Sequence, residues 1–174
     1  TSYAIESKNY KTDWQPTLFE TENPLYNADK SRVKGKIFTL DHDTNTNGRI
    51  DIDDLQWHYL EGDGDFRSAE VTALRDEADI IITNPPFSLF REFVAWLIDG
   101  KKNFLIIGNM NSITCKDIFP LIKENKMWLG NGFAAGNAFF RVAGSSSTDY
   151  ADGVYDANTG LVKFRNCCWF TNID

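Results

Sequence analysis

The feature that most constrains the fold is a run of three isoleucines that ends in a rigid tetrapeptide. Residues 79–83, Asp-Ile-Ile-Ile-Thr, form the short, continuous apolar pattern expected of a strand buried on both faces of a parallel sheet. Asn84-Pro85-Pro86-Phe87 follows directly. Apolar residues then recur at helical spacing, at Phe90, Phe93, Val94 and Leu97, and the pattern ends near Gly100. A strand followed at once by a helix indicates an α/β unit.

The same alternation continues along the chain. Residues 103–107 predict a second buried strand, and residues 113–126 predict a helix with Pro120 near its start or at a kink. Residues 138–142 and 161–170 are rich in strand-forming side chains and predict an antiparallel hairpin with a long loop. We therefore expect a Rossmann-like α/β fold, with a mostly parallel sheet, helices on both faces and a C-terminal antiparallel hairpin.

The first part of the chain is less regular. Apart from one short strand around residues 2–5, we expect irregular structure up to about residue 36. Three features follow: a strand over 36–40, an Asp- and Asn-rich turn, and a returning strand or short helix within 50–60. Ser68 can cap a helix over 69–77. We expect a single, partial catalytic domain over residues 1–174, with a polar hairpin insertion at about 36–60.

Length and composition fit a globular protein. The 174 residues, of which 42% are apolar, can bury a sizeable core. The sequence has neither an apolar run long enough to span a membrane nor a signal-peptide pattern at its start, so we expect no membrane partner and a cytoplasmic location. The three cysteines, Cys115, Cys167 and Cys168, offer neither a disulfide framework nor a metal-binding spacing, and we expect reduced core residues.

The net charge of −7 argues against independent binding to nucleic acid, because that affinity comes largely from Lys and Arg at phosphates. Many of the acidic residues, however, lie between Asp41 and Asp79, so the net charge of the whole chain need not describe the surface that meets a substrate. Residues 143–160 could approach DNA but contain no basic residue, so they are not assigned to phosphate contact.

Asn84-Pro85-Pro86-Phe87 suits methyl transfer to an amino group that is conjugated to a ring. Such an amine is a poor nucleophile until its lone pair is localised. The Asn84 carboxamide and the Pro85 carbonyl can both accept hydrogen bonds from the amine. The two prolines, Pro85 and Pro86, fix the backbone, and Phe87 offers a face on which a base can stack. A base in duplex DNA would have to flip out to reach this site.

Other interpretations of the motif remain. Asn and Pro are common in turns, so the tetrapeptide could be a simple turn after a strand. Its position at the carboxyl end of a strand in an α/β pattern, where open sheets bind ligands, favours a site instead. The amide nitrogen of a protein glutamine and the amines of RNA bases are also poor nucleophiles, for the same reason as the amine of adenine in DNA. They are therefore alternative substrates.

Several segments together resemble the EcoRI-type adenine-specific modification methylases. The similarity runs from Leu60 to Asp174 and is carried by Gly62-Asp-Gly-Asp-Phe-Arg-Ser68, Asn84-Pro-Pro-Phe-Ser-Leu-Phe-Arg91, Phe104-Leu-Ile-Ile-Gly-Asn109 and Cys168-Trp-Phe-Thr-Asn172. The resemblance implies a class I methyltransferase fold, S-adenosylmethionine (SAM) as methyl donor, and methylation of adenine N6 in DNA within a restriction–modification system.

The resemblance also implies a cofactor role for Asp65 and Phe66. In related enzymes an Asp-Phe pair before the catalytic motif holds the cofactor's adenine, and a carboxylate beside an aromatic ring suits that base. The alternative is a solvated acidic loop. Nothing before Leu60 resembles the family's methionine-binding turn, so we expect the first strand and that turn to lie in a missing N-terminal part of the same polypeptide.

One further motif points to a metal. Residues 43–54 place oxygen-bearing side chains at Asp43, Asn45, Asn47 and Asp54, with Gly48 at the sixth position, as in a calcium-binding EF-hand loop. The segment before it is strand-like rather than helical, and the last position is Asp rather than Glu. We therefore favour a polar hairpin turn and assign no metal ligand. A calcium-stabilised binding module is the non-enzymatic alternative.

Overall fold

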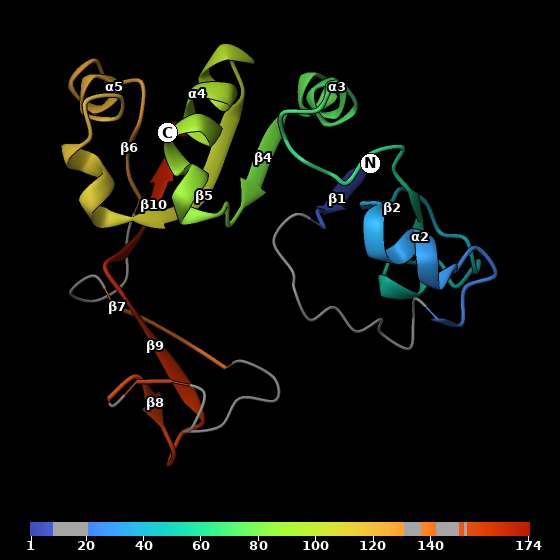
Figure 1. Ribbon diagram of the computed structural model, residues 1–174. Helices are drawn as coiled ribbons and strands as arrows, with labels where there is room; N and C mark the ends of the chain where they lie inside the picture. Colours follow the sequence, from blue (N-terminus) through green and yellow to red (C-terminus); the bar gives the residue numbers. More distant parts are fainter. Residues whose placement is uncertain (9–20, 131–136, 142–149, 152) are drawn as a thin grey trace. The chain divides into compact units, whose positions relative to one another are not determined.

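The structure is a computed structural model that describes residues 1–8, 21–130, 137–141, 150–151 and 153–174 (Figure 1). The chain divides into two compact units, Thr1–Leu74 and Arg75–Asp174. Each unit is described by itself, and the single-domain organisation stays a prediction. Residues 9–20 of the expected irregular stretch, and part of the expected loop after residue 141, lie outside the described residues. Every helix in the described ranges is too short or too polar to cross a membrane.

The first unit contains a three-stranded antiparallel sheet. Its strands β1 (Ser2–Glu6), β2 (Lys36–Leu40) and β3 (Gln56–Tyr59) follow the order β1-β2-β3. Lys36 pairs with Glu6 on one side and with Tyr59 on the other. The segment that could be a strand or a helix is therefore mainly a returning strand, preceded by a 3-10 turn over Ile52–Asp54. The predicted hairpin over residues 36–60 is observed as β2 and β3.

Two helices adjoin these strands in the sequence: one precedes β2 and the other follows β3. The helix α2 (Ala28–Val33) was not expected, although Asn27 supplies its start signal, because its side chain accepts from the Lys30 N–H. Six residues are too few for a helical period to stand out. The helix α3 (Ala69–Glu77) has the predicted bounds. The Ser68 hydroxyl caps it and accepts from the Val71 N–H at 3.2 Å.

The second unit contains a mixed four-stranded sheet. Its strands are β4 (Ile80–Thr83), β5 (Asn103–Asn109), β6 (Trp128–Leu129) and β10 (Cys167–Thr171), in the order β4-β5-β10-β6. β4 and β5 are parallel, whereas β10 is antiparallel to both of its neighbours. The expectation of a mostly parallel sheet is therefore confirmed only for the first pair. The physical reason is that β10, which arrives from the C-terminal hairpin, inserts between β5 and β6.

The burial expected for β4 is wrong on one face. Ile80 is 50% exposed and Ile82 is 69% exposed, whereas Ile81 and Thr83 are half-buried. β4 is the edge strand of its sheet, and alternate side chains of a strand point to opposite faces. An unbroken apolar run shows only that both faces can be buried, not that each of them is covered.

The helices after β4 and β5 differ in length. The helix α4 (Phe90–Asp99) lies against β5 (Figure 1), and its four predicted core residues, Phe90, Phe93, Val94 and Leu97, are all buried. The helix predicted over 113–126 is instead a 3-10 turn, η3 (Met110–Thr114), and a short helix, α5 (Phe119–Lys123). The extended backbone of Cys115 separates them, and Pro120 stands in the first turn of α5 as expected.

The predicted C-terminal hairpin forms a small sheet of its own. β7 (Asn137–Phe140) pairs antiparallel with β9 (Leu161–Arg165), which also pairs with β8 (Tyr155–Asp156). The run over 161–170 divides into β9 and β10 at Asn166, which has a left-handed φ of 56°. Cys167 and Cys168 at the start of β10 are buried thiols, and burial raises the pKa of Cys168 to about 11. Cys115 is also a free thiol but is only half-buried.

Gly108 in β5 allows two aromatic rings to pack closely in the second unit. The Phe90 ring of α4 lies 4.9 Å from the Phe170 ring of β10, and both residues are at most 1% exposed. A β-carbon at Gly108 would overlap the edge of the Phe90 ring and would also press against Phe170. Glycine therefore lets α4 approach the centre of the sheet.

Gly108→Ala should destabilise the protein by about 1–3 kcal/mol, because both neighbouring rings are buried and have little space to move. The free energy of unfolding from chemical denaturation measures the change. Gly62→Ala is the matched control, since a β-carbon there meets only the Glu70 carboxylate at 3.9 Å. Equal effects of the two substitutions would contradict the packing argument.

Candidate active site

The Asn84-Pro85-Pro86-Phe87 motif leaves the sheet at the shared carboxyl edge of β4 and β5. Because the two strands are parallel, with Thr83 opposite Ile106, their carboxyl ends point the same way. β5 ends at Asn109, which is the register partner of Cys167 at the start of β10. The sequence predicted the motif at this edge, and the sheet topology places it there. Asn109 is a further polar residue at the edge, and its carboxamide caps η3 by accepting from the Asn111 N–H at 2.9 Å.

The motif has a fixed backbone. Pro85 is buried, and Pro86 is extended with φ −57° and ψ 126°. The Pro86 carbonyl accepts from the Leu89 N–H at 2.9 Å, which starts the 3-10 turn η2 (Phe87–Leu89) that continues into α4. The buried face of α4 therefore anchors one end of the motif, and β4 anchors the other.

Two side chains of the motif reach the surface. The Asn84 side chain is exposed, and Phe87 is 43% exposed. Among the residues that the structure describes, none donates a hydrogen bond to the Asn84 carboxamide oxygen or to the carbonyl of the buried Pro85. An amide acceptor and an aromatic face are thus exposed to a ligand, next to a second acceptor without a donor among these residues. This arrangement can hold a planar group that carries an amine.

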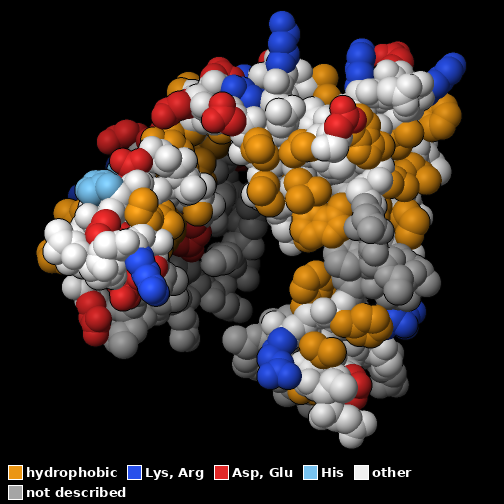
Figure 2. Space-filling view, turned by 180° about the vertical axis from the view of Figure 1, so that it is seen from behind, with side chains coloured by type: hydrophobic (Ala, Val, Ile, Leu, Met, Phe, Trp, Pro, Cys, Tyr) orange, Lys and Arg blue, Asp and Glu red, His pale blue; other side chains and the backbone are white. Residues whose placement is uncertain are grey.

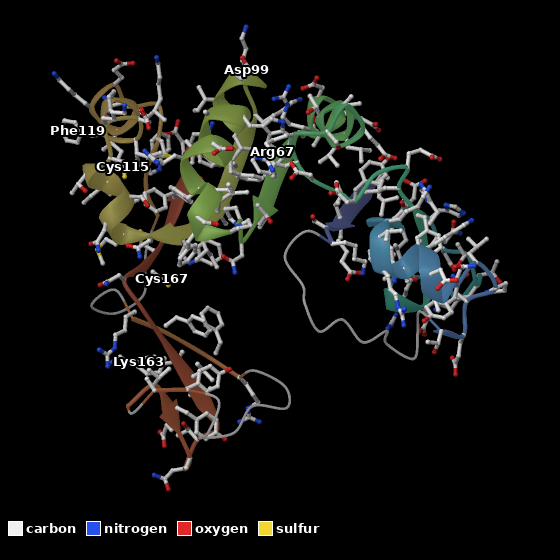
Figure 3. The ribbon with its side chains drawn as sticks, in the orientation of Figure 1. Arg67, Asp99, Cys115, Phe119, Lys163 and Cys167 are labelled. Carbon is white, nitrogen blue, oxygen red and sulfur yellow. The ribbon has the colours of Figure 1, made fainter. Side chains whose placement is uncertain are left out.

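Asp65 and Phe66 lie in the first unit, in the loop between β3 and α3. The Asp65 carboxylate accepts from the backbone N–H of Arg67, from its Nε at 2.9 Å and from its Nη2 at 2.7 Å. The Arg67 guanidinium also lies 5.5 Å from the Phe66 ring centre, and Phe66 is 8% exposed. Arg67 is labelled in Figure 3. The two predicted groups of site residues therefore belong to different units.

Sequence reasoning missed the role of Arg67. Its spacing of two residues from Asp65, across a tight Asp-rich loop, is the signal that could have identified the ion pair. Asp65 accepts with Oδ1 from the N–H and the Nε of Arg67 and with Oδ2 from its Nη2. Its cofactor role stays a prediction.

The calcium-like loop bonds to its own backbone. The Asp54 carboxylate accepts from the N–H groups of Thr44, Asn45 and Asp51. Asp43 accepts from the Gly48 N–H at 2.7 Å, and a strand, not a helix, leads into the loop. Within the described part of the chain, no group of three or more His, Cys, Asp or Glu residues could hold a metal ion. These contacts favour the polar hairpin turn.

Two hollows in the surface lie away from the motif. One of about 390 Å³ is lined by residues near β6 and the end of β10, including Trp128, Leu129 and Thr171. Another of about 270 Å³ lies on the small sheet, beside Phe139 and Lys163. Neither includes a residue of the motif. The assignment of the site therefore depends on its chemistry and its position in the sheet rather than on the shape of a cavity.

A mixed α/β sheet with polar acceptors at the carboxyl edge of a parallel pair is the arrangement expected of a ligand-binding α/β protein, the class that includes the methyltransferases. The sequence model of the family described as "Adenine-specific methyltransferase EcoRI" matches residues 6–174. The chain belongs to this family.

Curated relatives agree with the family. The chain is 45% identical over 127 residues to the type II methyltransferase M.EcoRI of Escherichia coli, a match that covers 72% of the chain and 39% of that protein. It is 35% identical over 121 residues to the type II methyltransferase M.MpnI of Mycoplasma pneumoniae, covering 66% of the chain and 36% of that protein. The chain thus spans less than two fifths of the length of these relatives. No solved structure matches significantly.

Asp54→Ala should lower the melting temperature at neutral pH, because it removes the acceptor for three backbone N–H groups. Hydrogen bonds, first from the Asp51 N–H and then from Thr44 and Asn45, lower the pKa of Asp54. Its stabilising effect is therefore present above the unfolded pKa of about 3.9 and is lost as pH falls through the lower folded pKa. The difference between wild type and variant should shrink in acid.

The exposed neighbour Asp53 provides the control, and Asp53→Ala should leave the melting temperature nearly unchanged. Adding Ca²⁺ to the wild-type protein should likewise cause no shift, since backbone N–H groups already occupy the carboxylates. A rise in melting temperature with Ca²⁺ would establish the calcium-binding alternative instead.

Proposed function

We propose that this protein transfers a methyl group from SAM to the N6 amine of adenine in DNA, as the modification enzyme of a restriction–modification system. The observation that carries the proposal is the pair of acceptors, the Asn84 carboxamide oxygen and the Pro85 carbonyl, which have no donor among the described residues and lie at the carboxyl edge of β4 and β5. Family membership and relatives named as type II methyltransferases support it. Since DNA is the proposed substrate, the proposal places the protein in the cytoplasm.

The geometry suits the chemistry of an aromatic amine. The two acceptors would each take one N–H of the adenine amine and draw its nitrogen towards tetrahedral geometry. The lone pair would then point away from the ring system and become nucleophilic. Because Pro85 is buried and the backbone of the motif is fixed, the acceptors are aimed before the substrate arrives. The excess proton on the product nitrogen can pass to water.

Phe87 would stack on the target base. Phe87 is 43% exposed, and it is the first residue of η2, the turn that leads into the helix α4. An adenine within a duplex reaches such a ring only by leaving the base stack. The proposal therefore includes a flipped adenine as the bound form of the substrate.

The residues around Asp65 fit the adenine end of SAM. A half-buried carboxylate is an acceptor suited to the amine of the base, and the Phe66 ring beside it offers apolar contact. When bound, SAM supplies the methyl group. Asp65 and Phe66 would hold only its base, and the class I methyltransferase fold of the family is the expected framework for the rest.

Asn84→Ala should reduce methyl transfer to adenine-containing duplex DNA by at least about 100-fold, since one of two acceptors aimed at the developing charge is lost. Cofactor affinity should stay within about two-fold, because Asn84 is assigned to the substrate. Transfer of labelled methyl groups and calorimetric titration of SAM measure the two effects.

The same transfer assay should include RNA and a glutamine-containing peptide in place of DNA. If methyl groups are transferred to RNA or to the peptide but not to DNA, the proposed substrate is wrong, and the proposed role of Asn84 still applies to the amine of the new substrate. Unchanged transfer by Asn84→Ala would refute the mechanism. Ser88→Ala, an exposed change next to the motif, is the matched control and should keep full activity.

Asp65→Ala should weaken SAM binding about 10-fold or more, as expected for loss of a hydrogen bond to a charged group. Glu61→Ala, a fully exposed acid in the same loop region with a 93% exposed side chain, should bind SAM like the wild type. Equal affinities of both variants in calorimetry would show that the acidic loop is only a solvated turn.

A further inference from the structure

Most of the net negative charge of the chain belongs to one unit. Residues 1–74 contain 14 acidic and 8 basic residues, a net charge of −6, whereas residues 75–174 contain 11 and 10, a net charge of −1. The net charge of −7 therefore says little about the unit that carries the Asn84 motif. A surface for a polyanion can exist on this second unit.

The small sheet β7–β9–β8 has two chemically different faces. Residues directly opposite each other in a sheet share a face, and Phe139 is opposite Lys163. Arg165, two residues further along β9, lies on the same face as Lys163. The opposite face carries Val162 and the Phe140 and Phe164 rings, which pack edge to face at 5.4 Å. One face thus packs its aromatic rings together, and the other displays cations.

The cationic face is accessible. Phe139 is 56% exposed, and Arg165 is exposed. The Lys163 ammonium lies 5.9 Å from the Phe139 ring centre and next to the 270 Å³ hollow. Figure 3 labels Lys163 on this sheet, and Figure 2 shows basic and apolar side chains close together on the same part of the chain. An aromatic ring beside cations is a common surface for nucleic acid.

The cations of this face have no acidic partner among the described residues. Elsewhere in the second unit, Arg75, Arg91 and Lys126 each pair with a carboxylate. Within the described part of the chain, no carboxylate lies within ion-pair distance of Lys163 or Arg165. Asp156 of β8 lines the same hollow as Lys163, and it accepts from the Asn158 N–H and the Thr159 hydroxyl of its own turn. Two such cations on one face suit two phosphates.

We propose that the face of the β7–β9–β8 sheet formed by Phe139, Lys163 and Arg165 binds the phosphate backbone of the DNA substrate. The inference rests on the proposed function, because it takes DNA as the substrate. Lys163 and Arg165 contact phosphates, and the Phe139 ring holds the Lys163 ammonium over its face. These contacts position the duplex and do not read its sequence.

The test compares the salt dependence of DNA binding between variants of the complete protein. With a short mixed-sequence duplex, the slope of log K against log salt should fall by about 1 for each lost phosphate contact. Lys163→Gln with Arg165→Gln should therefore reduce the slope by about 2. Lys123→Gln, which removes an exposed lysine of α5, is the matched control and should change the slope much less.

A second variant separates charge from folding. Lys163→Arg with Arg165→Lys keeps both charges and should keep the wild-type slope. The neutral double variant should also raise KM for DNA while leaving kcat nearly unchanged, because it touches no group that holds the amine. A reduced slope in the charge-preserving variant as well would overturn phosphate contact as the explanation.

The two proposals fail in different ways. If the wild-type protein methylates and binds DNA but the neutral double variant keeps the slope and KM, the surface assignment is wrong and the proposed function stands. If the wild-type protein neither binds nor methylates DNA, the proposed function fails and the surface assignment fails with it.

Discussion

The close contact of α4 with the centre of the sheet determines the geometry of the candidate site. Gly108 leaves space for the Phe90 ring, which packs on Phe170 at 4.9 Å. Phe90 begins α4, and only the motif and η2 lie between this helix and β4. Because both ends of the short link are fixed by packing, the Asn84 and Pro85 acceptors have a defined direction. An apolar contact thus aims polar groups that have no partners of their own among the described residues.

The carboxylates of Asp54 and Asp65 both accept hydrogen bonds from residues close to them in the sequence. Asp54 satisfies backbone N–H groups of its loop, and Asp65 holds Arg67. The two cases differ in consequence. Asp54 is 2% exposed and surrounded by donors from its own loop, so it stabilises a turn. Asp65 holds Arg67 beside the Phe66 ring, and binding of the cofactor is its proposed role. The same residue type therefore supports structure in one loop and a candidate site in another.

The distribution of charge resolves the apparent conflict between an acidic protein and the proposed DNA substrate. Most of the excess acid belongs to the first unit, while the second unit is close to neutral. Within the second unit, ion pairs neutralise several cations, such as Arg91 with Asp117, and leave Lys163 and Arg165 without acidic partners in the described part of the chain. Local pairing, rather than net charge, decides where a polyanion can bind.

The sequence by itself determined the local features and the family. Helical spacing fixed the buried face of α4, Ser68 fixed the start of α3, and the Asn-Pro-Pro-Phe motif with the segments around it indicated the family and the candidate site. These features depend on neighbours in the chain. Which strands pair, which face is covered and which charges meet depend on residues far apart in sequence. Only the tertiary structure placed β10 between β5 and β6, left Ile82 of the edge strand exposed, and gathered Phe139 and Lys163 on one face.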